Sequence, residues 1–239
     1  MTFTLEEAAD AILRLGKRVA AAGLVVGAGG NVSVRTGPDE IMVTPSGQAL
    51  DEIDRADLVI LGLDGAVRPG RSVAAGGGGR SGGAGSSRGT LPSSESLMHL
   101  AAHRARPDTP VALHVHPPHA NLLAAMCRPI RLITLDHAYY VRRLAQVPYL
   151  PSGTAELAAA VAEGLSEVDV VMLTHHGCLV VASDAETAYE RAVNLEAAAT
   201  ATYRALLLGD VTTVCPPAYL ARVEAQEAGI ADAGAGEDA

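Results

Sequence analysis

Short apolar runs typical of β-strands alternate with helical segments after residue 90, and this alternation constrains the fold most strongly. The runs 170–175 and 178–183 are separated by only two residues, which is typical of paired strands. Strands that alternate with helices indicate an α/β domain, and the paired strands make its sheet mixed. The predicted segments here are helices 94–106, 118–126, 154–165 and 185–208, and strands 111–116, 131–135, 170–175 and 178–183.

The N-terminal part adds one helix and three strands. Thr4, two early glutamates and apolar residues at helical spacing predict an amphipathic helix over residues 4–22. The alternating runs 31–35 and 40–45 flank the turn sequence Thr-Gly-Pro-Asp, which indicates a hairpin. A third strand is predicted over residues 57–62.

Two segments have little to bury. Residues 70–90 are dominated by Gly and Ser, so we expect a flexible insertion in a surface loop rather than a linker between domains. Residues 226–239 are small and acidic, which predicts a disordered tail. The organisation that follows is a single domain over residues 1–225 with one internal insertion.

Composition excludes several classes of protein. The formal net charge is −9, no basic run occurs, and the chain has one Phe and no Trp, so nucleic acid is not an expected partner. No segment has the roughly 18 uninterrupted apolar residues of a membrane span, and no secretory signal precedes the first helix. Three widely spaced cysteines with apolar neighbours predict reduced core residues. We therefore expect a cytoplasmic protein without a membrane association.

A histidine pair offers a metal site. All eight histidines lie between residues 99 and 176, and His114 and His116 stand two apart at the end of an apolar run. Residues two apart on a strand project from the same face, so both imidazoles can reach one ion. Three neutral imidazoles with an open fourth position suit catalytic Zn²⁺. The alternative is a pair of surface histidines in the turn before two prolines.

The third ligand is left open by spacing alone. Residues 174–177 read Thr-His-His-Gly between two apolar runs, and either His175 or His176 fits. Strand alternation points the two side chains in opposite directions, so only one of them can face the metal.

Glu95 follows Pro-Ser-Ser at the start of a predicted helix. An acidic residue in a first helical turn complements the helix dipole, and this ordinary role explains it well. The functional alternative makes Glu95 a base beside the metal while Ser93 and Ser94 bind a phosphate at the helix N-terminus. Two loops of small residues, 27–31 and 44–47, can complete such a phosphate site through their backbone amides.

Other polar side chains remain ambiguous. His137, Tyr139 and Tyr140 form a cluster that suits either acid/base chemistry or packing. His99 and His103 follow Glu95 at spacings of four and eight, so they share its helix face. They suit equally a supporting position near the metal or a solvated helix surface.

Five motifs taken in order resemble the class II aldolase/adducin family, most closely its L-fuculose-1-phosphate aldolase branch. They are GAGGNVSVR at 27–35, MVTPSG at 42–47, LPSSE at 91–95, HVHPPH at 114–119 and THHG at 174–177. The resemblance runs from about residue 5 to residue 208. It implies a three-layer α/β/α sandwich with a mixed, largely antiparallel sheet, a Zn²⁺ site, and a homotetramer with active sites at subunit interfaces.

The resemblance also implies roles for individual residues. The metal ligands fall on His114, His116 and His176, and the catalytic carboxylate falls on Glu95. The phosphate site falls on small and polar residues of the three loops, namely Gly30, Asn31, Ser46, Gly47, Ser93 and Ser94.

One position departs from the family pattern. Leu135 stands where the fuculose-phosphate aldolases place a catalytic tyrosine. We expect His137, with Tyr139 or Tyr140 as substitutes, to supply acid/base chemistry instead.

The implied activity is a Zn²⁺-dependent retro-aldol cleavage of a ketose 1-phosphate into dihydroxyacetone phosphate and an aldehyde, a lyase reaction on a sugar phosphate. A dehydratase acting on methylthioribulose 1-phosphate, a decarboxylase and an epimerase of the same family are alternatives. A non-catalytic adducin-like interaction module is a further one, but it would not need the intact histidines and Glu95.

Overall fold

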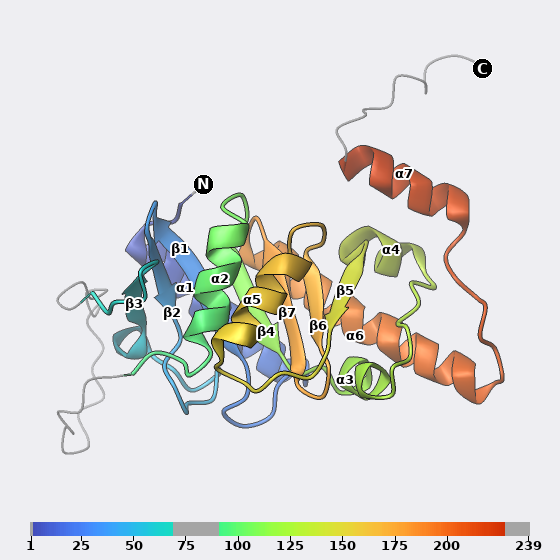
Figure 1. Cartoon of the computed structure of the whole chain (residues 1–239), viewed down its shortest axis with the longest axis horizontal. Coiled ribbons are helices and arrows are strands. Elements are labelled where there is room, and N and C mark those ends of the chain that lie inside the picture. Colours follow the sequence, from blue (N-terminus) through green and yellow to red (C-terminus); the bar gives the residue numbers. More distant parts are fainter. Residues whose placement is uncertain (1, 69–90, 228–239) are drawn as a thin grey trace, which may run out of the picture.

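A seven-stranded sheet forms the centre of the computed structural model, which describes residues 2–68 and 91–227 (Figure 1). The strand order is β3-β2-β1-β4-β7-β6-β5, and only β5 and β6 pair in parallel. The prediction of a mixed, largely antiparallel sheet is therefore confirmed. The strands are β1 Asn31–Gly37, β2 Glu40–Val43, β3 Val59–Gly62, β4 Val111–Val115, β5 Leu144–Val147, β6 Val170–Leu173 and β7 Gly177–Ala182.

Helices cover both faces of the sheet. In Figure 1, α2 and α5 lie in front of the strands, whereas α1 and the long α6 lie behind them. Buried residues cluster on both faces of the sheet, with one cluster that includes α1 and α6 and two that include α2, which confirms the three layers of an α/β/α sandwich. The helices are α1 Leu5–Ala21, α2 Ser96–Ala105, α3 Pro118–Ala125, α4 Leu135–Val141, α5 Ala155–Gly164, α6 Ala185–Leu207 and α7 Pro217–Glu227, with a short 3₁₀ turn at Arg55–Asp57.

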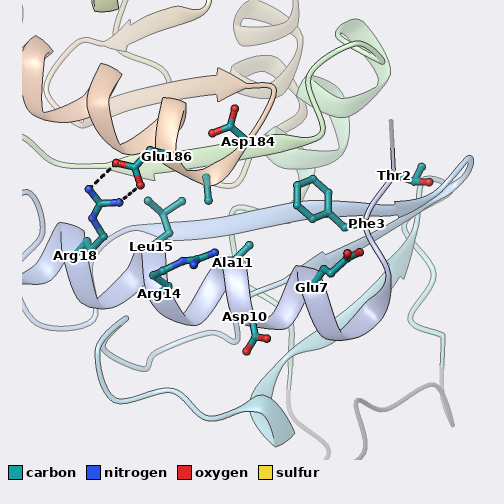
Figure 2. Close-up of a pocket in the computed structure, with 11 residues that line it drawn as sticks. Thr2, Phe3, Glu7, Asp10, Ala11, Arg14, Leu15, Arg18, Asp184 and Glu186 are labelled. Atoms are coloured by element: carbon teal, nitrogen blue, oxygen red, sulfur yellow. Dashed lines mark hydrogen bonds and ion pairs between the residues drawn. The ribbon is translucent and has the colours of Figure 1, made fainter.

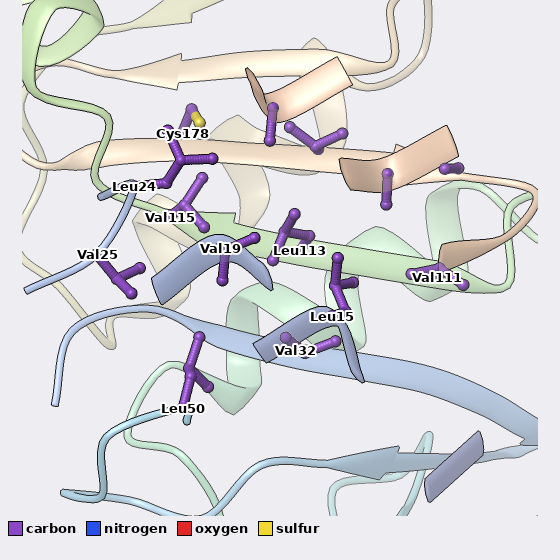
Figure 3. Packing of buried hydrophobic residues seen from close by; sticks show 14 of the residues in the cluster. Leu15, Val19, Leu24, Val25, Val32, Leu50, Val111, Leu113, Val115 and Cys178 are labelled. Carbon is purple, nitrogen blue, oxygen red and sulfur yellow. The ribbon is translucent and has the colours of Figure 1, made fainter. Parts of the chain in front are cut away.

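The two central strands divide their side chains between the layers. Val111, Leu113 and Val115 of β4 pack in the cluster that includes α1 and α6 (Figure 3), whereas Ala112 packs with α2 and α5. Because side chains alternate along a strand, His114 projects to the same face as Ala112. Successive residues of β1 follow the same rule: Val32 packs in the cluster that includes α1, and Ser33 contacts α2.

The first helix shows how local sequence sets its boundary. Thr4 accepts a hydrogen bond from the backbone of Glu7, and the Glu7 side chain accepts one from the backbone of Thr4. This reciprocal cap satisfies two backbone donors that the first helical turn leaves unpaired. The predicted helix over residues 4–22 is confirmed to within a residue at each end.

The prediction of a strand over residues 131–135 is wrong. Arg131 hydrogen-bonds through its backbone N–H to Thr202 of α6, and Leu132 accepts from the backbone of Cys215. Thr134 then caps α4, which begins at Leu135. These contacts with distant segments replace the strand ladder. β5, which pairs with β6, and the helices α4 and α7 were not predicted from the sequence.

Two smaller expectations also change. Cys127 is exposed, while Cys178 and Cys215 are buried as expected. α7 extends through Glu227, so the first residues of the predicted tail are helical, and residues 228–239 and the predicted insertion at 70–90 lie outside the described residues. None of the helices in the described part of the chain is both long and apolar enough to cross a bilayer.

Candidate active site

The candidate metal ligands begin at the end of β4. His114 is fully buried in the strand, and His116 follows directly after it. Their ring centroids lie 4.7 Å apart, so the two-residue spacing does place both imidazoles on one side. His114 Nδ1 lies 2.9 Å from the carbonyl oxygen of Cys178 in β7. A carbonyl only accepts, so Nδ1 carries a proton, and Nε2 is the nitrogen that faces the other candidate ligands.

The turn between β6 and β7 brings in His176 and leaves His175 outside. The ring of His176 lies 4.8 Å from that of His114 and 5.3 Å from that of His116, measured between centroids. His175 has a left-handed φ of 64° and is exposed, with its ring 6.4 Å from that of Tyr149. The left-handed residue reverses the chain and turns its own side chain away from the cluster.

Two glycines allow the histidine segments to approach their neighbours. A Cβ on Gly177 would lie 2.5 Å from the carbonyl oxygen of Val115 and 2.6 Å from Cδ2 of His116. Gly30 has φ of 78°, and its Cβ would lie 2.8 Å from the carbonyl oxygen of His114. Any larger residue at either place would displace the backbone or ring that carries a candidate ligand.

Glu95 completes the cluster from the residue that precedes α2. Its Oε2 lies 3.1 Å from His114 Nε2, and its Oε1 lies 3.1 Å from His176 Nε2. Asn31 donates to Oε2 at 2.9 Å, and Ser152 donates to Oε1 at 2.7 Å. Burial would raise the pKa of the Glu95 carboxyl, but the contacts with both histidines and Asn31 hold the pKa below its ordinary value. Glu95 is therefore ionised at neutral pH.

The donor set fits a divalent cation. One ligand atom from each of Glu95, His114, His116 and His176 lies within 4.8 Å of the others. Ring nitrogens and a carboxylate converge at one point, since His114 Nε2 lies 2.9 Å from His116 Nε2 and 3.1 Å from the Glu95 carboxylate. Imidazole nitrogens and carboxylate oxygens are common ligands of divalent metals in proteins. Burial, followed by the neighbouring imidazoles, lowers the pKa of His116 to about 4, so this ring is neutral and able to bind a metal.

A cavity of about 230 Å³ adjoins the cluster. Its walls come from the loop before β1, the loop after β2, the residues before α2 and the two histidine segments. All six residues predicted to bind phosphate line it, together with Glu95, His116 and His176: Gly30, Asn31, Ser46, Gly47, Ser93 and Ser94. Three loops that are far apart in the sequence therefore meet beside the candidate ligands.

Sequence reasoning missed part of the surroundings of Glu95. Ser152 was not singled out, and its only local signal is a Pro-Ser-Gly-Thr turn before α5. His99 and His103 are fully buried rather than solvated. Helical spacing showed only that they share a helix face with Glu95 and left their burial open. Asn31 was expected at the phosphate, yet its amide nitrogen donates to Glu95.

The predicted acid/base cluster lies elsewhere in the chain. His137, Tyr139 and Tyr140 belong to α4, which packs against α6 and α7, and none of them lines the cavity at the metal cluster. His137 is buried and takes part in the cap of α4, with its Nδ1 3.3 Å from the backbone nitrogen of Thr134. Burial lowers the pKa of its imidazole.

A larger cavity of about 690 Å³ lies along α1 and the start of α6 (Figure 2). Arg18 pairs with Glu186 across one end, and Phe3 and Arg14 line the wall. None of the candidate metal ligands borders this cavity. The volume of a cavity therefore does not identify the candidate active site. The three histidines and the Glu95 carboxylate identify it.

Comparison with known proteins gives a consistent result. A family model described as the Class II Aldolase and Adducin N-terminal domain matches residues 10–203. The chain is 29% identical over 207 residues to a 5-deoxy-D-ribulose 1-phosphate aldolase of Bacillus thuringiensis serovar kurstaki, covering 86% of this chain and 89% of the relative. It is 30% identical over 179 residues to an L-fuculose phosphate aldolase of Methanococcus maripaludis, covering 75% and 87%.

Two further similarities bear on the fold and on the range of activities. A solved structure of an L-fuculose 1-phosphate aldolase superposes with a TM-score of 0.78 at 25% identity, covering 92% of this chain and 96% of that one. A 3-oxo-tetronate 4-phosphate decarboxylase of Haemophilus influenzae is 26% identical over 192 residues, covering 78% and 82%. The solved aldolase thus shares the fold, and the similar proteins differ in the reactions that their names state.

Proposed function

The chain belongs to the class II aldolase and adducin family, and we propose that it is a Zn²⁺-dependent aldolase that cleaves a ketose 1-phosphate to dihydroxyacetone phosphate and an aldehyde. The observation that carries this proposal is the position of Glu95, whose two oxygens each lie 3.1 Å from a candidate metal ligand at the edge of a cavity lined by three small-residue loops. A lyase of this kind needs a metal, a base and a phosphate site in one place.

His114, His116 and His176 would hold the metal, and when bound it would act as a Lewis acid toward a substrate carbonyl. Three imidazoles leave a coordination position open, which is typical of catalytic rather than structural Zn²⁺ sites. A carboxylate oxygen of Glu95 lies within 4.8 Å of the histidine ligand atoms, so Glu95 would be available as a fourth ligand.

Glu95 is the proposed base. In the synthetic direction its ionised carboxylate would accept a proton from the carbon of dihydroxyacetone phosphate that forms the new bond. The contacts from Asn31 and Ser152 fix both carboxylate oxygens, so the group is held in place before substrate arrives.

The three loops supply the proposed phosphate site. Gly30, Gly47 and the serines at 46, 93 and 94 offer small side chains and hydroxyl groups to the cavity, and Ser93 and Ser94 lie next to the start of α2. Helix N-termini attract anions because their backbone N–H groups and dipole are directed outward. Asn31 would link this site to Glu95, since it borders the cavity and bonds to the carboxylate.

The proton donor for the aldehyde oxygen is proposed to be His137, with Tyr139 or Tyr140 as alternatives, from a second copy of the chain in a homotetramer. Leu135 and Tyr139 on α4 are about half exposed, which leaves this helix available for contact with another subunit. A His137→Ala variant is expected to lose turnover by roughly 100-fold or more while it keeps its metal, since general acids contribute 10²–10⁴-fold. Steady-state rates and metal content test this, and unchanged turnover would exclude the role.

The activity itself is tested by two measurements on the full chain. We expect about one zinc ion per subunit in the purified protein. We also expect release of dihydroxyacetone phosphate from at least one member of a panel of ketose 1-phosphates, detected with a coupled dehydrogenase. Treatment with a chelator should abolish the release, and added Zn²⁺ should restore it. Metal-free protein that nevertheless cleaves the substrate would contradict the proposal.

A decarboxylase, a dehydratase or an epimerase acting on a sugar phosphate is the second candidate, favoured by the similarity to the 3-oxo-tetronate 4-phosphate decarboxylase. These reactions can use the same metal, base and phosphate site, so product analysis distinguishes them: carbon dioxide, water loss or an epimer would replace the aldehyde. A purely structural adducin-like module is disfavoured because the complete set of histidines and Glu95 lies assembled at a cavity.

A further inference from the structure

A chain of buried side chains leads from Glu95 into the space between β1 and α2. Asn31 Nδ2 lies 2.9 Å from Glu95 Oε2, and Asn31 Oδ1 lies 2.5 Å from His99 Nε2. Ser33 Oγ then lies 2.6 Å from His99 Nδ1 and 2.8 Å from His103 Nε2. We call Glu95, Asn31, Ser33, His99 and His103 the buried hydrogen-bond chain.

Donor and acceptor can be assigned at each hydrogen bond of the buried hydrogen-bond chain. A carboxylate only accepts, so Asn31 donates through Nδ2 and turns its Oδ1 toward His99. His99 must then donate from Nε2, which leaves Nδ1 as an acceptor for the Ser33 hydroxyl. Since Ser33 has only one proton, its oxygen accepts from His103 Nε2.

His103, at the end of the buried hydrogen-bond chain away from Glu95, agrees with this assignment. If His103 carries its proton on Nε2, its Nδ1 is an unprotonated acceptor. Among the described residues, Nδ1 of His103 is one of three buried side-chain nitrogen or oxygen atoms without a hydrogen-bond partner. A buried acceptor without a partner is tolerated more often than a buried donor without one. The unpaired atom of the buried hydrogen-bond chain is therefore an acceptor, as the assigned directions predict.

Burial makes the arrangement rigid. Ser33 and His99 have no exposed surface, and His103 is 1% exposed, so water cannot replace the links that join these three residues. Burial also lowers the pKa of His99 to about 3 and that of His103 well below its ordinary value. Both rings are therefore neutral at physiological pH, each with the single N–H that the chain requires.

We propose that Ser33, His99 and His103 are positioning residues that fix the amide of Asn31 and, through it, the catalytic carboxylate of Glu95. The inference rests on the proposed function, in which Glu95 is the base. A primary amide does not readily accept and release a proton, so the chain holds geometry and does not conduct protons from Glu95 to the interior. The other carboxylate oxygen is held independently by Ser152.

The proposal is tested by proton abstraction alone, without an aldehyde. Zinc-loaded full-length protein is incubated with dihydroxyacetone phosphate in D₂O, and loss of the carbon-bound proton is followed by ¹H NMR. For Ser33→Ala and His99→Leu we expect kcat for exchange to fall roughly 10- to 100-fold, because small misplacement of a catalytic group costs up to about 10²-fold. KM and zinc content should stay within about two-fold. His99→Gln should recover much of the rate, since its amide nitrogen can donate to Asn31.

Thr202→Val is the matched control. Thr202 is as buried as Ser33, and its hydroxyl accepts from the backbone N–H of Arg131, away from Glu95. It should lower thermal stability without changing the exchange rate. Unchanged exchange in both Ser33→Ala and His99→Leu, or equal losses in His99→Gln and His99→Leu, would overturn the inference.

A second measurement does not depend on activity or on variants that fail to fold. The ¹⁵N NMR spectrum of the histidine rings in the wild-type chain should show His99 and His103 as neutral Nε2–H tautomers. An Nδ1–H tautomer at His99 would overturn the inference whatever the exchange rates are. Failure of zinc-loaded wild-type protein to exchange the proton would instead overturn the proposed function, and the inference with it.

Discussion

A His116→Ala variant is expected to bind Zn²⁺ at least about 100-fold more weakly than the wild-type chain, because even partners outside the coordination sphere are worth 10- to 100-fold in affinity. His116 Nε2 lies 2.9 Å from His114 Nε2, and its pKa of about 4 makes it a neutral ligand at pH 7. Removing it leaves two imidazoles and a carboxylate. Competition with a fluorescent zinc chelator gives the affinity, and elemental analysis gives the metal content.

His175 provides the control for this experiment, since it precedes a candidate ligand in the chain but points away from the cluster. A His175→Asn variant keeps a residue type that tolerates the left-handed backbone at φ 64°. It should bind zinc as the wild type does. Normal zinc binding by His116→Ala, or loss of zinc from His175→Asn with the fold intact, would show that the ligands are assigned incorrectly.

The second large effect is expected at Glu95. A Glu95→Gln variant should retain zinc, because three imidazoles remain, but its turnover should fall by about 10²–10⁴-fold, the usual contribution of a general base. The substitution keeps the shape of the side chain and removes only its ability to accept a proton. Release of dihydroxyacetone phosphate and metal content, measured on the same sample, separate the two roles.

Ser152→Ala serves as the comparison for Glu95→Gln. It removes a hydrogen bond of 2.7 Å to Oε1 but leaves the carboxylate and all three histidines in place. We expect a turnover between those of the wild type and Glu95→Gln. If Glu95→Gln loses its zinc together with its activity, Glu95 is primarily a ligand and the base must be sought elsewhere.

Much of the fold was predictable because strands and helices with strong hydrophobic periodicity are specified locally. The two runs at β6 and β7, the reciprocal cap at Thr4 and the helices α5 and α6 follow from patterns within a few residues. The segment 131–135 failed for the opposite reason. Its apolar residues suit a strand, but hydrogen bonds with Thr202 and Cys215 from distant segments decide its conformation.

Some features of the candidate site were likewise predictable from local sequence, and others were not. The spacing of His114 and His116 placed both rings on one side of a strand, and this prediction depends only on strand geometry. The presence of Glu95 near them followed from a family resemblance rather than from any local rule. The proposed acid/base residues of α4 lie away from the cavity of their own chain, and no sequence pattern indicates which subunit they would serve.

The sequence by itself determined an α/β fold, a histidine pair able to share an ion, and small-residue loops able to approach an anion. Spacing alone left His175 and His176 open, and the family resemblance indicated His176. The tertiary structure gives the physical reason, because the left-handed backbone at His175 turns that side chain away while His176 joins the cluster. It also decided that His99 and His103 are buried in contact with Ser33. Helical spacing fixes which face of α2 they share with Glu95, but only packing against β1 determines whether that face meets water or the interior.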